Sequence, residues 1–242
     1  MSAVERLSTG AAFEFRPAQG AEAIAPAALL VHGWRSSIFQ SSTIDEIVNG
    51  LSSAGVHSML LSLRGHDLAE GDINTVSRQN HTADLVAAYQ YLLARAEVDG
   101  ERICGLGRSY GGYLLAASSN ILTFRNLVLA QPALYADDGW AEPMAPRADT
   151  PDMEWRKLLH VPKDSRALLA LADYHFHARV LLVTSGKDEF MPAEVGESYL
   201  TAIRPTQVLP ITYQDAEHVL RADDRKDYIE RATKWLVKSI ED

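Results

Sequence analysis

The segment "GRSYGG" at residues 107–112 places a serine, Ser109, between glycines, and a serine in such a setting can act as a nucleophile. An apolar run, "RICGLG", leads into it, and a helix-like run, "YLLAASS", follows it. This context predicts a sharp turn from a buried strand into a helix, with the hydroxyl of Ser109 above the strand ends. Small residues are expected at Gly107 and Gly111, where strand and helix pass closely. The alternative interpretation is a glycine-rich turn with a solvated serine.

A serine hydroxyl is a weak nucleophile at neutral pH, so it needs a base that takes its proton. His218 is the preferred base because it follows the last predicted strand and precedes the final helix. In an open α/β sheet that loop lies at the carboxyl ends of the strands, on the same edge as Ser109. His32 and His66 also end strands on that edge and are rival bases. The remaining histidines are interpreted as structural or exposed.

An acid is needed to orient the base, and Asp188 in "VTSGKDEFMP" follows the penultimate predicted strand. The adjacent Glu189 is expected to point away if Asp188 points inward. Asp137 and Asp138, which follow the preceding strand, are alternatives. The chain order of serine, acid and histidine is typical of hydrolases that use a nucleophile elbow.

An acyl-transfer intermediate also needs N–H groups that stabilise its oxyanion. The backbone N–H of Tyr110 is one candidate, because the first N–H groups of a helix have no partner within the helix. The backbone N–H of Trp34, the last residue of "LLVHGW", is the second candidate.

The elements that position these residues follow from hydrophobic periodicity. Ile44, Ile47, Val48 and Leu51 fall at i, i+3, i+4 and i+7, which predicts a helix that Gly55 closes. Four further helices are expected at 81–97, 109–119, 193–203 and 227–240. Strands are expected at 11–16, 26–34, 57–66, 102–107, 126–133, 179–186 and 207–213. Alternating strands and helices predict an α/β fold, doubly wound, with a mostly parallel sheet and helices on both faces.

A long segment between two predicted strands interrupts this alternation. Residues 132–178 include the proline-rich "EPMAPRADTP" and two expected short helices, near 152–160 and 164–175. Such a long connection favours a lid or cap. The predicted organisation is therefore a core at 1–131 and 179–242 with a helical cap insertion at 132–178.

Composition narrows the class of protein. The 242 residues are 47% hydrophobic and 23% charged, as in ordinary soluble domains, and the net charge of −9 argues against a nucleic-acid partner. The N-terminal residues lack the apolar stretch of a signal peptide, and no apolar run is long enough for a membrane span. The single cysteine, Cys104, suits a reducing compartment, so a cytoplasmic location is expected. No metal or cofactor motif is present, and none is expected to be bound.

Five motifs together resemble the α/β-hydrolase fold serine hydrolases across nearly the whole chain. They are "HGW", "LRGHDLAEGD", "GRSYGG", "SGKDEFMP" and "EH", in that order. The "GRSYGG" and "RGH" forms are most similar to the prolyl-oligopeptidase-like branch, which contains peptidases and small acyl esterases. The resemblance implies an eight-stranded sheet and implies that His32 braces the oxyanion loop. Asp67 and Ala69 depart from the R-G-H-G-x-S form that is frequent in that branch, so a local difference is expected in this loop.

The resemblance implies an enzyme that cleaves a carboxylic ester of a small molecule through an acyl-enzyme intermediate. An aminopeptidase, an acyl-peptide hydrolase or a thioesterase is the alternative, and a non-hydrolytic binding or lyase member of the fold is the third interpretation. The oligomeric state is open, with a homodimer as one option. Candidate substrate-pocket residues are Arg35, Arg108, Trp140 and Trp155. For the arginines a salt bridge to acids such as Glu70 or Asp72 is the alternative, and for the tryptophans it is packing within the cap.

Overall fold

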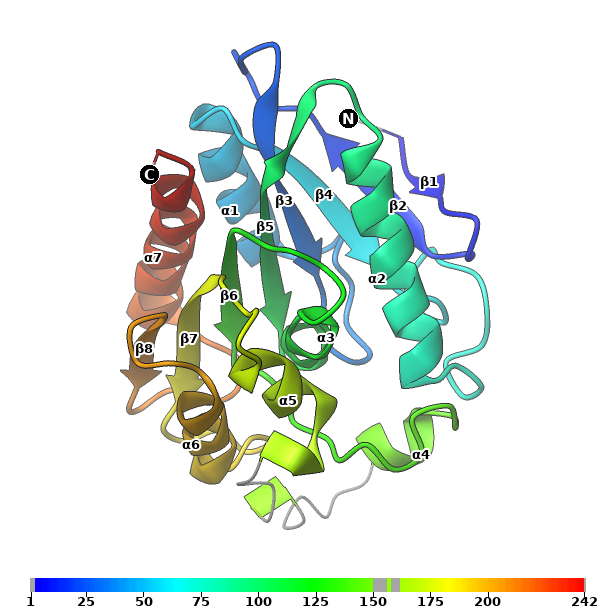
Figure 1. Ribbon diagram of the computed structural model, residues 1–242, viewed down its shortest axis with the longest axis vertical. Coiled ribbons are helices and arrows are strands. Elements are labelled where there is room, and N and C mark those ends of the chain that lie inside the picture. Colours follow the sequence, from blue (N-terminus) through cyan, green and yellow to red (C-terminus); the bar gives the residue numbers. More distant parts are fainter. Residues whose placement is uncertain (1–2, 150–155, 158–161, 242) are drawn as a thin grey trace.

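The computed structural model describes residues 3–149, 156–157 and 162–241. Its strands form one eight-stranded sheet in the order β1-β2-β4-β3-β5-β6-β7-β8 (Figure 1). Neighbouring strands from β4 to β8 pair in parallel, and β2 pairs antiparallel to both β1 and β4. The predicted doubly wound, mostly parallel sheet is confirmed. The strands are β1 (Glu5–Arg6), β2 (Ala12–Arg16), β3 (Ala25–Val31), β4 (His57–Ser62), β5 (Val98–Arg108), β6 (Asn126–Ala130), β7 (Arg179–Ser185) and β8 (Val208–Tyr213).

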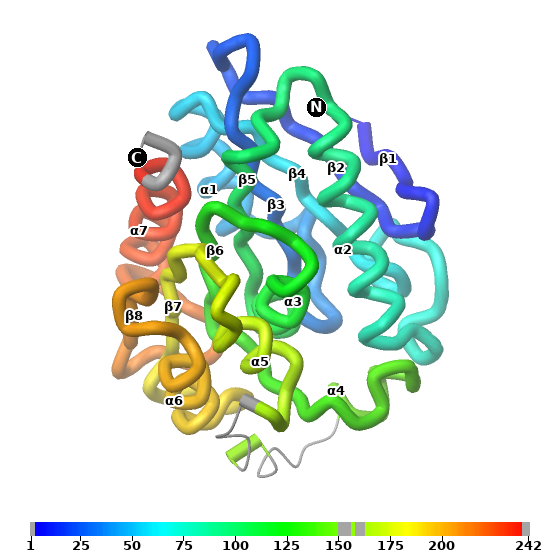
Figure 2. Tube along the Cα trace, viewed as in Figure 1, coloured from blue at the N-terminus to red at the C-terminus, as the bar shows by residue number. Residues whose placement is uncertain are grey.

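Helices cover both faces of this sheet (Figure 1). They are α1 (Ser42–Ser53), α2 (Arg78–Leu93), α3 (Tyr110–Ser118), α4 (Ala145–Ala148), α5 (Arg166–Ala172), α6 (Ala193–Ala202) and α7 (Ala222–Glu241), with a 3-10 turn, η2 (Pro162–Asp164). Residues of α1 and α7 share one buried cluster, and residues of α2, α3, α5 and α6 share the other. In the tube view α4 lies beyond the carboxyl edge of the parallel strands, and the last turns of α7 lie at the opposite end (Figure 2).

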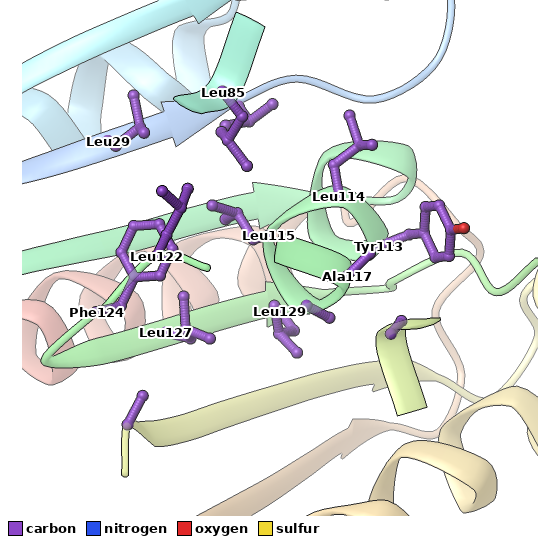
Figure 3. Packing of buried hydrophobic residues seen from close by; sticks show 14 of the residues in the cluster. Leu29, Leu85, Tyr113, Leu114, Leu115, Ala117, Leu122, Phe124, Leu127 and Leu129 are labelled. Carbon is purple, nitrogen blue, oxygen red and sulfur yellow. The ribbon is translucent and has the colours of Figure 1, made fainter. Parts of the chain in front are cut away.

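Successive side chains along the central strands point to opposite faces of the sheet, so each strand contributes to both buried clusters. Leu127 and Leu129 of β6 pack on the α3 side, whereas Val128 between them packs on the α7 side. Figure 3 shows Leu115 and Leu114 of α3 within the first cluster. All five side chains are fully buried, and each such burial contributes roughly 1.5–3 kcal/mol.

Local sequence signals account for the starts of two helices. The Ser41 side chain accepts a hydrogen bond from the N–H of Ile44, which caps α1, and the four residues predicted for its buried face are all buried. Ser77 and Asn80 form a capping box at the start of α2.

Several element boundaries differ from expectation, and the contacts of two of them show why. The strand expected at 57–66 ends at Ser62, because the N–H groups of Leu63 and Arg64 donate to the side chains of His32 and Asp84 and not to another strand. Helix α7 begins at Ala222, five residues before the expected start at 227. Asp223 and Asp224 in its first turn favour that earlier start, because acids stabilise the positive end of the helix dipole.

The segment expected to form a cap is only partly described. The helix expected near 152–160 lies almost entirely outside the described residues. Helix α5 lies within the one expected at 164–175, and its buried Leu168 and Leu171 join the cluster beneath α3. The division into a core and a cap at 132–178 stays a prediction. Within the described part of the chain, no helix has the length and apolar character needed to cross a bilayer.

Candidate active site

Ser109 occupies a strained turn between β5 and α3. Its backbone angles are φ 52° and ψ −117°, and a positive φ costs a non-glycine residue on the order of 1 kcal/mol or more. Hydrogen bonds on both sides of the residue hold this conformation. The N–H of Ser109 donates to the carbonyl of Ala130 at 2.8 Å, and its own carbonyl accepts from the N–H of Ala133 at 3.0 Å. Ser109 is partly exposed.

The glycines around Ser109 allow this close turn. A Cβ at Gly107 would lie 2.5 Å from the backbone of Gly111. A Cβ at Gly111 would lie 2.5 Å from the carbonyl oxygens of His32 and Val31. Both contacts are with rigid backbone, which confirms the expectation that strand and helix pass too closely here for side chains.

His218 and Asp188 meet at the same edge of the sheet. The Nδ1 atom of His218 lies 2.8 Å from Oδ2 and 3.0 Å from Oδ1 of Asp188. Because a carboxylate accepts hydrogen bonds, Nδ1 carries the proton and Nε2 is left as the basic nitrogen. The N–H groups of Phe190 and Met191 donate to Oδ1 of Asp188 at 2.9 and 2.8 Å and hold the carboxylate in place.

Two contacts tie the backbone of His218 to the rest of the edge. Arg108, the neighbour of Ser109, donates from Nη2 to the carbonyl of His218 at 3.0 Å. The main-chain N–H of His218 donates to Oε2 of Glu189 at 2.9 Å. The expectation that Glu189 points away is therefore wrong. Asp188 holds the ring of His218, and Glu189 holds its main chain.

The rival bases serve as structural groups. His32 is buried, its Nδ1 donates to the carbonyl of Gly33 at 2.6 Å, and its Nε2 accepts from the N–H of Leu63 at 3.0 Å. Burial, followed by the nearby His66, lowers the pKa of His32 to about 3. Burial also lowers the pKa of His66. His32 thus braces the loop after β3, as the resemblance implied.

The rival acids are engaged elsewhere. Asp137 accepts from the N–H of Arg166 at 2.7 Å, and Asp138 pairs with the guanidinium of Arg147 at 2.6 Å.

The two candidate oxyanion donors come from the loop after β3 and from the first residue of α3. A Cβ at Gly33, next to Trp34, would lie 3.3 Å from the Cβ of Ser109, so the loop after β3 approaches the serine directly. Among the described residues, neither the backbone N–H of Trp34 nor that of Tyr110 donates a hydrogen bond. Both are therefore free to donate to a ligand.

The side chain of Tyr110 belongs to a buried network that the sequence did not indicate. Its hydroxyl donates to Nδ1 of His81 at 2.8 Å, and Nε2 of His81 donates to the carbonyl of Arg64 at 2.9 Å. His81 is fully buried, and burial lowers its pKa to about 3. Trp34 and His66 pack against these rings. His81 and Leu85 are four residues apart and share one helix face, and this spacing was the sequence signal that His81 would be buried.

Among the described candidates for the substrate pocket, Arg35 and Trp140 contact other side chains. Arg35 pairs with Asp149 at 2.6 Å, and the indole Nε1 of Trp34 donates to the same carboxylate at 2.8 Å. The alternative of an ion pair for Arg35 is thus confirmed, but the expected partners Glu70 and Asp72 are wrong. Asp149 takes that place because α4 brings it over the loop.

The guanidinium of Arg166 lies over the ring of Trp140, with its Cζ atom 4.5 Å from the ring centroid. Trp155 lies outside the described residues. Arg108 lines a cavity of about 90 Å³ together with Gly33 of the loop after β3.

Solved structures share this architecture over almost their whole length. Est1E from Butyrivibrio proteoclasticus, solved with bound ferulic acid, has a TM-score of 0.74 at 14% identity and full coverage of both chains. The α/β hydrolase GrgF from Penicillium sp. sh18 has a TM-score of 0.74 at 12% identity, covering 100% of this chain and 99% of its own. An esterase from Pyrococcus furiosus has a TM-score of 0.70 at 16% identity, with 99% and 91% covered. The fold is that of the α/β hydrolases.

Sequence comparison gives the family. Residues 62–242 match the prolyl oligopeptidase family, and this chain belongs to it. The protein is accordingly a hydrolase of the α/β fold, as the motifs had indicated. No curated protein is significantly similar to the chain in sequence.

Proposed function

We propose that this protein is a serine esterase that cleaves a carboxylic ester of a small to medium molecule through an acyl-enzyme intermediate. The observation that carries the proposal is the strained Ser109 at the end of β5, with the His218–Asp188 pair on the same sheet edge. Strain of this kind persists only where surrounding contacts hold it, and it is frequent at catalytic positions.

Each residue has a distinct role in the proposed reaction. Ser109 attacks the ester carbonyl through Oγ while Nε2 of His218 takes the hydroxyl proton. His218 then gives that proton to the departing alcohol, which leaves the acyl group on Ser109. Asp188 accepts the Nδ1 proton of His218 in a hydrogen bond and stabilises the imidazolium. Water, deprotonated by His218, releases the acid and restores the serine.

The backbone N–H groups of Trp34 and Tyr110 are proposed to stabilise the oxyanion that forms in both steps. The loop of Trp34 is braced and Tyr110 begins a helix, so both N–H groups need little reorganisation when the negative charge of the oxyanion develops. Removal of one such donor typically lowers kcat about 100- to 1000-fold.

An ester is favoured over an amide by two structural relatives. One was solved with ferulic acid, a carboxylic acid, and another is described as an esterase. Peptide hydrolysis is the second candidate, and the family match supports it. Turnover of aminoacyl amides at rates comparable to matched esters would favour the peptidase.

Labelling by a fluorophosphonate probe and turnover of short p-nitrophenyl esters test the proposal together. Ser109→Ala should abolish labelling and lower kcat by at least about a thousandfold, because the nucleophile acts as a unit with its base. Ser119→Ala is the matched control, since Ser119 is partly exposed at the other end of the same helix. Labelling or full turnover that persists in Ser109→Ala would refute the assignment.

A further inference from the structure

A cavity of about 90 Å³ lies behind the His218 loop. Its walls come from the loop after β3, the first turn of α1 and the first half of α7. These two helices pack side by side on one face of the sheet (Figure 1). Val219 and Leu220, directly after His218, form another wall, so the cavity adjoins the candidate active site without including Ser109.

The cavity is positively charged within an acidic protein. Arg108 and Arg225 line it, and its described lining includes no Asp or Glu, although the chain carries a net charge of −9. Arg225 is already paired, because its Nη2 lies 2.6 Å from Oε1 of Glu46. Arg108 has no carboxylate partner among the described residues, and its hydrogen bond goes to the carbonyl of His218. Burial lowers the pKa of Arg108, because desolvating a cation is costly, and the nearby Tyr228, Asp188 and Glu189 act in the opposite sense.

Tyr228 presents a second unused donor. Its side chain is 4% exposed and lines the cavity, and its hydroxyl has no hydrogen-bond partner in the described part of the chain. Burial raises the pKa of Tyr228, with the charge of Arg108 acting in the opposite sense, so the hydroxyl keeps its proton at neutral pH. Ser41 and Thr43 add the amino-terminal turn of α1, where backbone N–H groups favour anions.

We propose that this cavity binds a small oxyanion, a carboxylate or a phosphate, through the guanidinium of Arg108 and the hydroxyl of Tyr228. Arg108 is partly buried and makes no direct ion pair among the described residues, so an oxyanion would supply a contacting charge for its guanidinium and an acceptor for Tyr228. The anion has two sources to distinguish. It is either a carboxylate on the substrate, or a free anion that influences the position of His218 through the contact of Arg108 with the His218 backbone.

Isothermal titration calorimetry with inorganic phosphate and with acetate, at constant ionic strength balanced by NaCl, tests binding directly. Wild type should bind at least one of the two anions saturably. Tyr228→Phe should weaken that affinity about tenfold or more, because a hydrogen bond to a charged group is lost. Arg108→Gln should abolish it. Arg6→Gln removes the same charge from an exposed site on β1 and should bind as wild type does.

The absence of saturable binding to wild type would overturn the proposal, as would unchanged affinity in folded Tyr228→Phe. Circular dichroism checks folding, and the conservative Tyr228→Phe variant keeps the test valid if Arg108→Gln does not fold. This readout needs no turnover, so it can succeed or fail independently of the esterase assignment.

Kinetics with paired esters, one carrying a carboxylate and one the matching carboxamide, distinguish the sources. If the substrate supplies the anion, phosphate should raise KM for the carboxylate ester alone, by competition. If the anion is a free ligand, the anion should still bind in calorimetry, but phosphate should not raise KM for the carboxylate ester alone. This second arm rests on the proposed esterase function.

Discussion

Acidification should destabilise this protein through histidines that the fold keeps neutral. His32 and His81 are buried with pKa values lowered to about 3, whereas a histidine in an unfolded chain has a pKa of about 6.5. The unfolded chain therefore takes up protons that the folded protein does not accept as the pH falls. The stability from this difference is fully present above about pH 6.5 and declines from there toward pH 3.

The size of the effect follows from the shift. Between pH 7 and pH 5 each of the two histidines should lower the free energy of unfolding by about 2 kcal/mol, which makes about 4 kcal/mol together. His66, whose pKa burial also lowers, acts in the same direction. A loss of this size is a large part of the 5–15 kcal/mol that typically stabilises a domain, to order of magnitude.

Urea unfolding followed by circular dichroism at pH 7, 6 and 5 measures this dependence. His81→Asn keeps an acceptor for Tyr110 and removes the titrating ring, so its stability should fall by about 2 kcal/mol less over the same range. His175→Asn, at an exposed position, is the matched control and should keep the wild-type slope. Equal slopes in His81→Asn and wild type would refute the assignment of a neutral, buried His81.

Two substitutions at the elbow should separate packing from chemistry. Gly111→Ala should cost about 1–3 kcal/mol or more of stability and most of the activity, because its Cβ would lie 2.5 Å from two backbone carbonyls; native-like unfolding in urea would contradict this. Tyr110→Phe removes the hydroxyl that donates to Nδ1 of His81 and should cost about 1–3 kcal/mol while leaving the backbone N–H in place. Its ester kcat should therefore stay within about tenfold of wild type, and a loss as large as in Ser109→Ala would show that the side chain takes part in the reaction.

The fold was largely predictable because its signals are local. The helical face of Ile44, Ile47, Val48 and Leu51, the buried central strands and the glycines around Ser109 each follow from neighbouring residues in the chain. The edge strand β8 was predicted from its apolar run, although most of its residues are exposed or half-buried. The ends of elements were predicted less accurately. Strand β4, for example, ends early because the N–H groups at residues 63 and 64 donate to side chains from other elements.

The site was predictable only as a set of residue types on one sheet edge. In an α/β fold the ends of parallel strands converge, so Asp188 and His218 could be placed together from their positions after successive strands. Asp188 contacts the ring of His218 and Glu189 contacts its main chain, a division between adjacent acids that spacing does not reveal.

The sequence by itself determined the α/β architecture and the order of serine, acid and histidine, since hydrophobic periodicity and turn residues act over a few positions. Only the tertiary structure decided which polar groups meet. Trp34 and Asp149 are 115 residues apart in the chain, and the Arg108 guanidinium reaches a carbonyl 110 residues away. Such contacts depend on how the whole sheet twists and how its helices pack, because small changes in backbone direction move distant side chains by several ångströms.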